Sequence, residues 1–234
     1  KFYEIQNFRH VYSKFTRDLM GMIHEGTARA FAASGQYDSA IANAQKALFY
    51  FHQMVAPENP KLFSLNMIYG ASLAKSGQFQ KADSVLETTL QSAITAFGED
   101  HPVTIRINLE RCNTALENHN AEKCKSILTS LAGLSRVQQD PELAYQFLLL
   151  KAELIFATGG GVAEGPAKQD LINTISEAIQ KFRDIRNQFL TEEARARSVV
   201  TSIEALHNLV RALYALYQQS ADEDLYSLML SISE

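Results

Sequence analysis

The sequence has few of the residues that mark most functional classes. Among its 234 residues only 2 are cysteine, too few for a disulfide framework, so cysteine usage leaves the redox compartment open. No apolar run approaches the roughly 18 to 20 residues that a membrane-spanning helix needs. Lysine and arginine number 22 against 26 acidic residues, and the basic residues are scattered. This balance argues against nucleic acid or an anionic membrane as the main partner.

Proline and glycine are also sparse, with 5 and 11 residues. Both stand mostly where helical periodicity stops, as expected of an all-α chain. The length is sufficient to bury a sizeable core. Because the chain begins at Lys1 without an initiator methionine or a signal-like segment, we expect a piece of a longer protein from which any targeting segment is missing.

One short stretch recurs along the chain. The letters GQYDSAI at 35–41 return as GQFQKAD at 77–83, an offset of 42 residues. Pro60 and Pro102 are separated by the same 42 residues. A third, weaker copy has His119 in place of the turn glycine. Self-similarity at a fixed period of this length is the signature of stacked supersecondary units.

Small side chains recur at two positions of each copy, midway along the first helix and near the start of the second. Two helices can approach closely there only if the side chains are small. Large apolar residues follow, and each second helix carries an apolar stripe at helical spacing. The pattern predicts antiparallel helical hairpins. The small residues are Ala28, Gly70, Cys112 and Ala152 on the first helices, and Ala40, Ala82 and Cys124 on the second.

This small-then-aromatic hairpin resembles the tetratricopeptide repeat (TPR). The letters FGEDHP at 97–102, between two copies, look like the longer, 42-residue version of that repeat found in kinesin light chains and many bacterial proteins. The resemblance covers residues 18 to about 190. It implies an all-α fold, a right-handed superhelical TPR solenoid of antiparallel helical hairpins.

The repeat step and the turn signals divide the chain into a leading helix, four hairpins and a C-terminal helical pair that we expect to be truncated. A glycine-rich insertion, GGGVAEGP at 159–166, is expected to be a flexible loop. The divisions are 1–17, 18–59, 60–101, 102–140, 141–190 and 191–234. The helices are expected at 2–16, 18–33, 37–53, 61–75, 79–96, 102–117, 121–135, 141–158, 167–189 and 191–218.

A second resemblance concerns the last fifty or so residues. The letters FRDIR at 182–186, ALYQQSADEDLY at 215–226 and SISE at 231–234 are similar to the segment that precedes the protease in bacterial TPR-CHAT proteins, a caspase-like family. This implies a regulatory or sensor arm of a larger peptidase whose protease domain follows Glu234. The alternative interpretation is a free-standing TPR peptide receptor of the quorum-sensing-regulator type.

Catalytic and metal chemistry are not indicated. Cys112, His119 and Cys124 lack the C-x-x-C or H-x-x-x-H spacing of zinc sites. Because both cysteines occupy small packing positions, we predict buried sulfurs that lie close together and remain thiols. The glycine-rich loop lacks the Gly-Lys-Ser/Thr of a phosphate cradle. We therefore predict no catalytic residue, no metal and no cofactor, and a visible chain that is not itself an enzyme.

In TPR solenoids the first helices of successive hairpins line a concave surface, so the repeat register names candidate binding residues. Chaperone-tail-binding TPR domains use Lys and Asn where this chain has Glu25 and Arg29, so we do not expect that carboxylate clamp. The expected partner is a protein or peptide, with a protease domain of the same chain as one option, and the expected location is the cytoplasm. Nucleic acid and membrane are not expected partners. The candidates are Glu25, Arg29, Ser64, Met67, Lys75, Arg106, Asn113, Glu117, Gln146 and Glu153.

Overall fold

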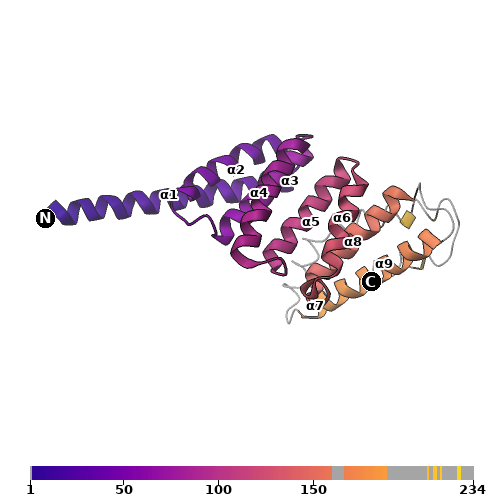
Figure 1. Ribbon diagram of the computed structural model, residues 1–234. Coiled ribbons are helices and arrows are strands. Elements are labelled where there is room, and N and C mark those ends of the chain that lie inside the picture. The colour runs from indigo at the N-terminus through magenta and orange to yellow at the C-terminus, as the bar shows by residue number, and fades with distance from the viewer. Residues whose placement is uncertain are drawn as a thin grey trace. The chain divides into compact units, whose positions relative to one another are not determined.

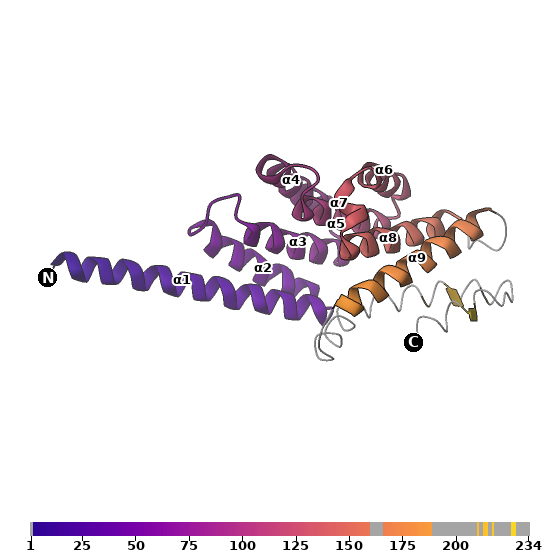
Figure 2. The same ribbon diagram turned by 90° about the horizontal axis from the view of Figure 1, so that it is seen from below.

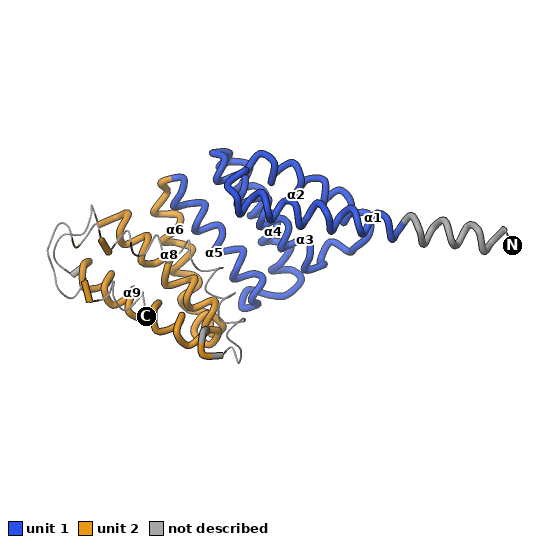
Figure 3. The backbone as a smooth tube through the Cα atoms, turned by 180° about the vertical axis from the view of Figure 1, so that it is seen from behind, with its two compact units in different colours: residues 1–118 blue, residues 119–234 orange. Residues whose placement is uncertain are grey.

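The computed structural model describes residues 2–159 and 166–188 and positions 210, 213, 214, 217, 226 and 227, with side chains from Lys14 onward except at 166, 186 and 188. Every regular element among these residues is a helix (Figure 1). The chain divides into two compact units, residues 1–118 and 119–234 (Figure 3). The division falls inside the third predicted hairpin, so the two helices of that hairpin belong to different units.

The first unit consists of five helices. Within it α3 contacts α1, α2, α4 and α5. The helices α1, α3 and α5 are therefore successive neighbours in one layer, against which α2 and α4 pack. The bounds are α1 (Phe2–Ala33), α2 (Tyr37–His52), α3 (Pro60–Lys75), α4 (Phe79–Phe97) and α5 (Pro102–Glu117).

The hairpin turns explain the recurring glycine. Gly35 and Gly77 have φ values of 74° and 79°, in the left-handed region that other residues seldom occupy. His119 stands at the equivalent turn with a φ of 55°. The third copy therefore keeps the backbone conformation of the turn although it has lost the glycine.

Three helices begin with a proline that follows a side-chain cap. Proline is favoured at the first helical position because its missing N–H would have no partner there. The preceding side chain accepts a hydrogen bond from a free backbone N–H of the first turn. The pairs are Asn59-Pro60 at α3, His101-Pro102 at α5 and Asp140-Pro141 at α8 (Pro141–Thr158). The first two are one repeat step apart, so the caps recur with the repeat.

The small residues of the repeat lie at close helix contacts, as predicted. A Cβ atom at Gly70 would lie 2.7 Å from Leu86 Cδ2, so α3 and α4 could not pack at this distance around a larger residue. Ala28, Ala40 and Ala82 have no exposed surface. The register drawn from the sequence is therefore the register of the packed hairpins.

The helix α1 runs unbroken from Phe2 to Ala33. The sequence predicted a helix ending at 16 and a new one beginning at 18, and that break is wrong. The boundary came from counting the repeat step back from Pro60, whereas the local sequence contains no proline or glycine to stop a helix. Once a helix is nucleated it adds one hydrogen bond per residue, so it continues across such a stretch.

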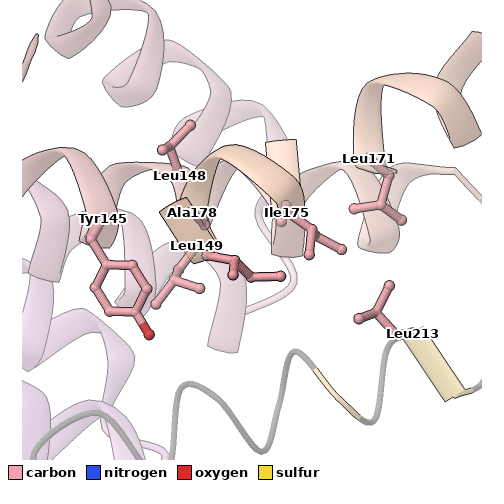
Figure 4. Packing of buried hydrophobic residues seen from close by; sticks show 9 residues of the cluster. Tyr145, Leu148, Leu149, Leu171, Ile175, Ala178 and Leu213 are labelled. Carbon is pink, nitrogen blue, oxygen red and sulfur yellow. The ribbon is translucent and has the colours of Figure 1, made fainter. Parts of the chain in front are cut away.

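The second unit contains α6 (Ala121–Ala132), α7 (Ser135–Gln139), α8 and α9 (Pro166–Gln188). The hairpin of α8 and α9 matches the predicted fourth hairpin, whereas α7 was not predicted. The core of the second unit joins α8 and α9 to Leu213, which is fully buried against them (Figure 4). The glycine-rich run at 160–165 and most of the helix predicted at 191–218 lie outside the described residues.

Candidate binding face on the first helices

Polar side chains gather on one face of the layer formed by α1, α3 and α5. We call this set the α1–α3–α5 face. Its members come from three helices that are far apart in sequence and adjacent in space. They are Glu25, Arg29, Ser64, Lys75, Glu110, Asn113 and Glu117.

Arg29 links α1 to α3. Its Nη2 donates hydrogen bonds to Glu25 Oε1 at 3.0 Å and to Ser64 Oγ at 2.8 Å. The Arg29 side chain is 51% exposed, against 16% for Glu25. A guanidinium carries five N–H donors, and both bonds use one of its three nitrogens. This cation is therefore held in place by two helices while half of it faces solvent.

Lys75 links α3 to α5 in the same way. Its Nζ lies 2.6 Å from Glu117 Oε1. The two residues are one 42-residue step apart, so they occupy equivalent positions on neighbouring first helices. Both side chains are partly exposed, at 38% and 20%. Such half-exposed pairs contribute little to stability, roughly 0 to 1 kcal/mol, so a ligand could displace one partner at low cost.

Glu110 is the member of the face with a perturbed carboxyl group. Burial raises its pKa from 4.5 to about 7, with a further upward contribution from the negative charge of Glu117. A hydrogen bond from Asn113 and the charge of Lys75 act in the opposite direction. The Oε1 atom of Glu110 is buried and makes no hydrogen bond. With a pKa of about 7, the protonated and charged forms of this carboxyl group are both populated at neutral pH, beside an ion pair.

The sequence interpretation did not select Glu110. The signal was available, because Glu110 lies three residues before Asn113 and seven before Glu117, which is the spacing of one helical face. The repeat register picked positions by their match to earlier copies, and neither of the first two copies has an acidic residue at the matching place.

The remaining predicted residues do not gather on this face in the same way. Met67 packs against the apolar cluster that contains Phe63 and Ile107, so it is partly a core residue. Arg106 lies on α5 and is partly buried. Gln146 and Glu153 lie on α8 in the second unit, where both are partly buried. Whether any of the ten predicted residues contacts a ligand stays a prediction.

The two cysteines are buried at the predicted small positions, each with no exposed surface. Both are disulfide-bonded and neither is free. The prediction that they remain thiols is wrong. Repeat register places a residue on a helix face, but it does not supply the separation and orientation of the Cα–Cβ bonds on which disulfide formation depends.

The described residues contain no cluster of three or more His, Cys, Asp or Glu side chains that could hold a metal ion. Among the described helices none is both long enough and apolar enough to cross a membrane.

Stacked antiparallel hairpins with a left-handed turn residue and small residues at the helix contacts define a TPR-like repeat fold. Two crystal structures of nearly identical TPR-like repeats from a candidate kinesin light chain of Podosopora anserina are similar to this chain. The first has a TM-score of 0.59 at 16% identity and covers 91% of this chain and 94% of its own. The second, a single-substitution variant of the same protein, gives the same TM-score, identity and coverage of this chain, and covers 93% of its own.

At 16% identity these matches show the shared fold. No protein-family model matches the sequence, and no curated protein matches it either.

Proposed function

We propose that this chain is a protein-interaction scaffold that binds an extended protein segment across the α1–α3–α5 face. The observation that carries the proposal is the pair of contacts Arg29–Ser64 and Lys75–Glu117, which join the first helices of three successive hairpins into one polar surface. The TPR-like fold supports it, because a repeat array presents the same face of successive helices side by side.

The charges of the face define the chemistry of the segment. A bound chain running from α1 toward α5 would meet the cation of Arg29, then the Lys75–Glu117 pair, then Glu110. Positive and negative groups alternate along this path, so a segment with both acidic and basic or amide side chains fits better than one with a single sign of charge. The exposed pairs would open and re-form around such a ligand with little loss of stability.

A selected peptide tests this proposal. Peptides are selected from a random twelve-residue phage library on the immobilised chain, and the best one is measured by calorimetry. We expect Arg29→Ala and Lys75→Ala each to weaken binding about fivefold to thirtyfold, because each variant removes one charged hydrogen-bonding partner of the peptide. Lys46→Ala on α2 is the matched control, because it removes an exposed cation outside the face.

Three results would contradict the proposal. The first is a selected peptide that binds the two face variants as tightly as the unchanged chain. The second is an equal loss of binding with the Lys46 control. The third is a loss of binding in Arg106→Ala while Arg29→Ala and Lys75→Ala leave binding intact. That result would place the ligand on α5 alone.

The finer hypothesis is that this scaffold is the sensor arm of a larger bacterial caspase-like peptidase. It rests on the sequence resemblance of 182–186, 215–226 and 231–234, and the comparisons with known proteins add nothing to it. The free-standing peptide receptor is the alternative. Reading the gene separates them, since continuation past Glu234 into a domain with a His and a Cys would support the sensor arm, whereas a stop codon shortly after Glu234 would exclude it.

The cytoplasmic location also remains a hypothesis. Disulfides persist in oxidising compartments and are rare in the cytosol. The disulfide-bonded state of both cysteines therefore weighs against the cytoplasm. Thiol counting on protein isolated under conditions that block exchange would decide this point.

A further inference from the structure

The helix α1 carries a row of large apolar side chains that no other part of the described chain covers. Phe15 is 65% exposed, Leu19 46%, Met22 51% and Ile23 50%. Single exposed apolar residues are normal on a protein surface, but several on adjacent turns of one helix indicate an interaction site.

The row follows a heptad pattern. Phe15, Leu19 and Met22 are separated by 4 and 3 residues, which is the spacing of the a and d positions of a coiled coil. The sequence continues this alternation toward the N-terminus without interruption. The complete series is Ile5, Phe8, Tyr12, Phe15, Leu19 and Met22.

The side of α1 opposite the row is occupied within the first unit. A Cβ atom at Gly21 would lie 2.6 Å from Phe51 Cε1, so α1 meets the end of α2 on that side. Ala28 is fully buried in the cluster that includes Leu62 and Leu65 of α3. These contacts use helical positions that lie away from the apolar row, which is why the row stays open.

The N-terminal part of α1 also extends beyond its own hairpin. Arg17 Nη1 lies 3.5 Å from Gln53 Oε1, just after α2 ends. Some fifteen residues of α1 precede Arg17, a length of about 20 Å, and no other described helix runs beside the N-terminal part of α1 (Figure 2). A single helix of that length is marginal in water without a packing partner.

We propose that α1 pairs with α1 of a second copy of this chain in a parallel two-stranded coiled coil along residues 5–22. One pair of flanking charges favours the parallel direction. With Ile5 at position a, the g positions hold Glu4, Val11, Asp18 and Glu25, and the e positions hold Arg9, Thr16 and Ile23. In a parallel pair g faces e of the partner, so Glu4 faces Arg9, whereas an antiparallel pair brings acidic g positions together.

The area is sufficient for a stable dimer. Six side chains of this size, three of them aromatic, would bury on the order of 700 to 800 Å² on each helix. Two copies would then bury about 1,500 Å², the size of a standard specific interface. Over residues 4–25, the basic residues Arg9, Lys14 and Arg17 are matched by Glu4, Asp18 and Glu25. A membrane surface is therefore a poorer match than a second helix of the same sequence.

Analytical ultracentrifugation of the full chain between about 1 and 100 µM tests the pairing. We expect a concentration-dependent dimer whose dissociation constant rises at least a hundredfold in the double variant Phe15→Glu, Leu19→Glu. Phe49→Glu is the matched control, because Phe49 is also 65% exposed and lies on α2, away from the row. Circular dichroism verifies that each variant keeps its helix content. A chain that is monomeric throughout, or a control that dissociates as much as the double variant, overturns the proposal.

An Ile5→Cys variant tests the direction. In the parallel dimer the two introduced thiols are neighbours and form an interchain disulfide on mild oxidation, seen as a doubled mass under denaturing conditions. An antiparallel dimer would place them about 25 Å apart, and the absence of the cross-link in a dimeric variant overturns the parallel arrangement. Co-sedimentation of a monomeric chain with phosphatidylcholine–phosphatidylglycerol vesicles would assign the row to a lipid surface and also overturn the proposal.

Discussion

Replacing Glu110 with glutamine should change how the stability of the chain depends on pH. The pKa of Glu110 is raised from 4.5 to about 7, first by burial and then by the charge of Glu117. Between these two pH values the folded chain holds a proton that the unfolded chain has lost. The free energy of unfolding therefore falls as the pH rises from about 4.5 through 7, and the loss is complete above the folded pKa.

The size of the effect follows from the shift. At 1.36 kcal/mol per pKa unit, a rise from 4.5 to about 7 corresponds to a penalty of about 3 kcal/mol at most at pH 8. Glu110 is not fully shielded from solvent, so we expect about 1 to 3 kcal/mol. Glutamine has nearly the same shape and no charge to bury. Glu110→Gln should therefore stabilise the chain by this amount at pH 8 and change its stability little at pH 5.

Urea unfolding followed by circular dichroism between pH 5 and 8.5 measures the free energy of unfolding of the unchanged chain and of Glu110→Gln at each pH. The matched control is Glu58→Gln, the same chemical change at an exposed residue in the loop before α3. Its stability profile should run parallel to that of the unchanged chain. The argument fails if Glu110→Gln also runs parallel to the unchanged chain, or if it is the less stable of the two at pH 8.

Further predictions concern packing, the turn and the sulfurs. Gly70→Ala should destabilise the chain by about 1 to 3 kcal/mol, because its Cβ would meet Leu86 at 2.7 Å. Gly26→Ala on the open side of α1, where nothing lies within 4 Å, should instead stabilise it by about 0.5 to 1 kcal/mol. His119→Gly should stabilise the chain by up to about 1 kcal/mol, since glycine adopts the φ of 55° without the cost that a side chain adds there. Thiol titration of the denatured chain should find no free thiol before reduction and two after it, with a lower melting temperature once the disulfide-bonded cysteines are reduced.

Thermal or urea denaturation checks the three glycine predictions. Equal shifts for Gly70→Ala and Gly26→Ala would mean that the close contact of α3 with α4 does not limit packing. A loss of stability in His119→Gly would show that the imidazole makes a contact worth more than the backbone strain. Two reactive thiols in the unreduced chain would refute the disulfide-bonded state.

Much of the fold could be predicted because its signals are local. The step from 35–41 to 77–83 placed the turns, and the structure confirms them through the left-handed φ of Gly35, Gly77 and His119. The prolines at 60, 102 and 141 placed the starts of α3, α5 and α8 within a residue. Where no local signal exists, the prediction failed, and the false break near residue 17 of α1 is the clearest case.

The candidate site could be predicted only in part. Repeat register identified Arg29, Lys75 and Glu117 as residues of the first helices, because it fixes which face of a helix a residue occupies. It did not reveal that Lys75 and Glu117 are ion-paired or that Arg29 bonds Ser64. It also placed Met67 with the polar candidates, although its side chain lies against an apolar cluster.

The sequence alone therefore determined the helical hairpins, their turns and their packing positions, since each depends on residues within one or two helical turns of each other. The tertiary structure decided everything that depends on distances between helices. It brought Lys75 to Glu117 across 42 residues, raised the pKa of Glu110 by burying its carboxyl group, and placed in disulfide bonds the cysteines that the sequence left as thiols. It also left the apolar row of α1 open, because α2 and α3 pack on other faces of that helix.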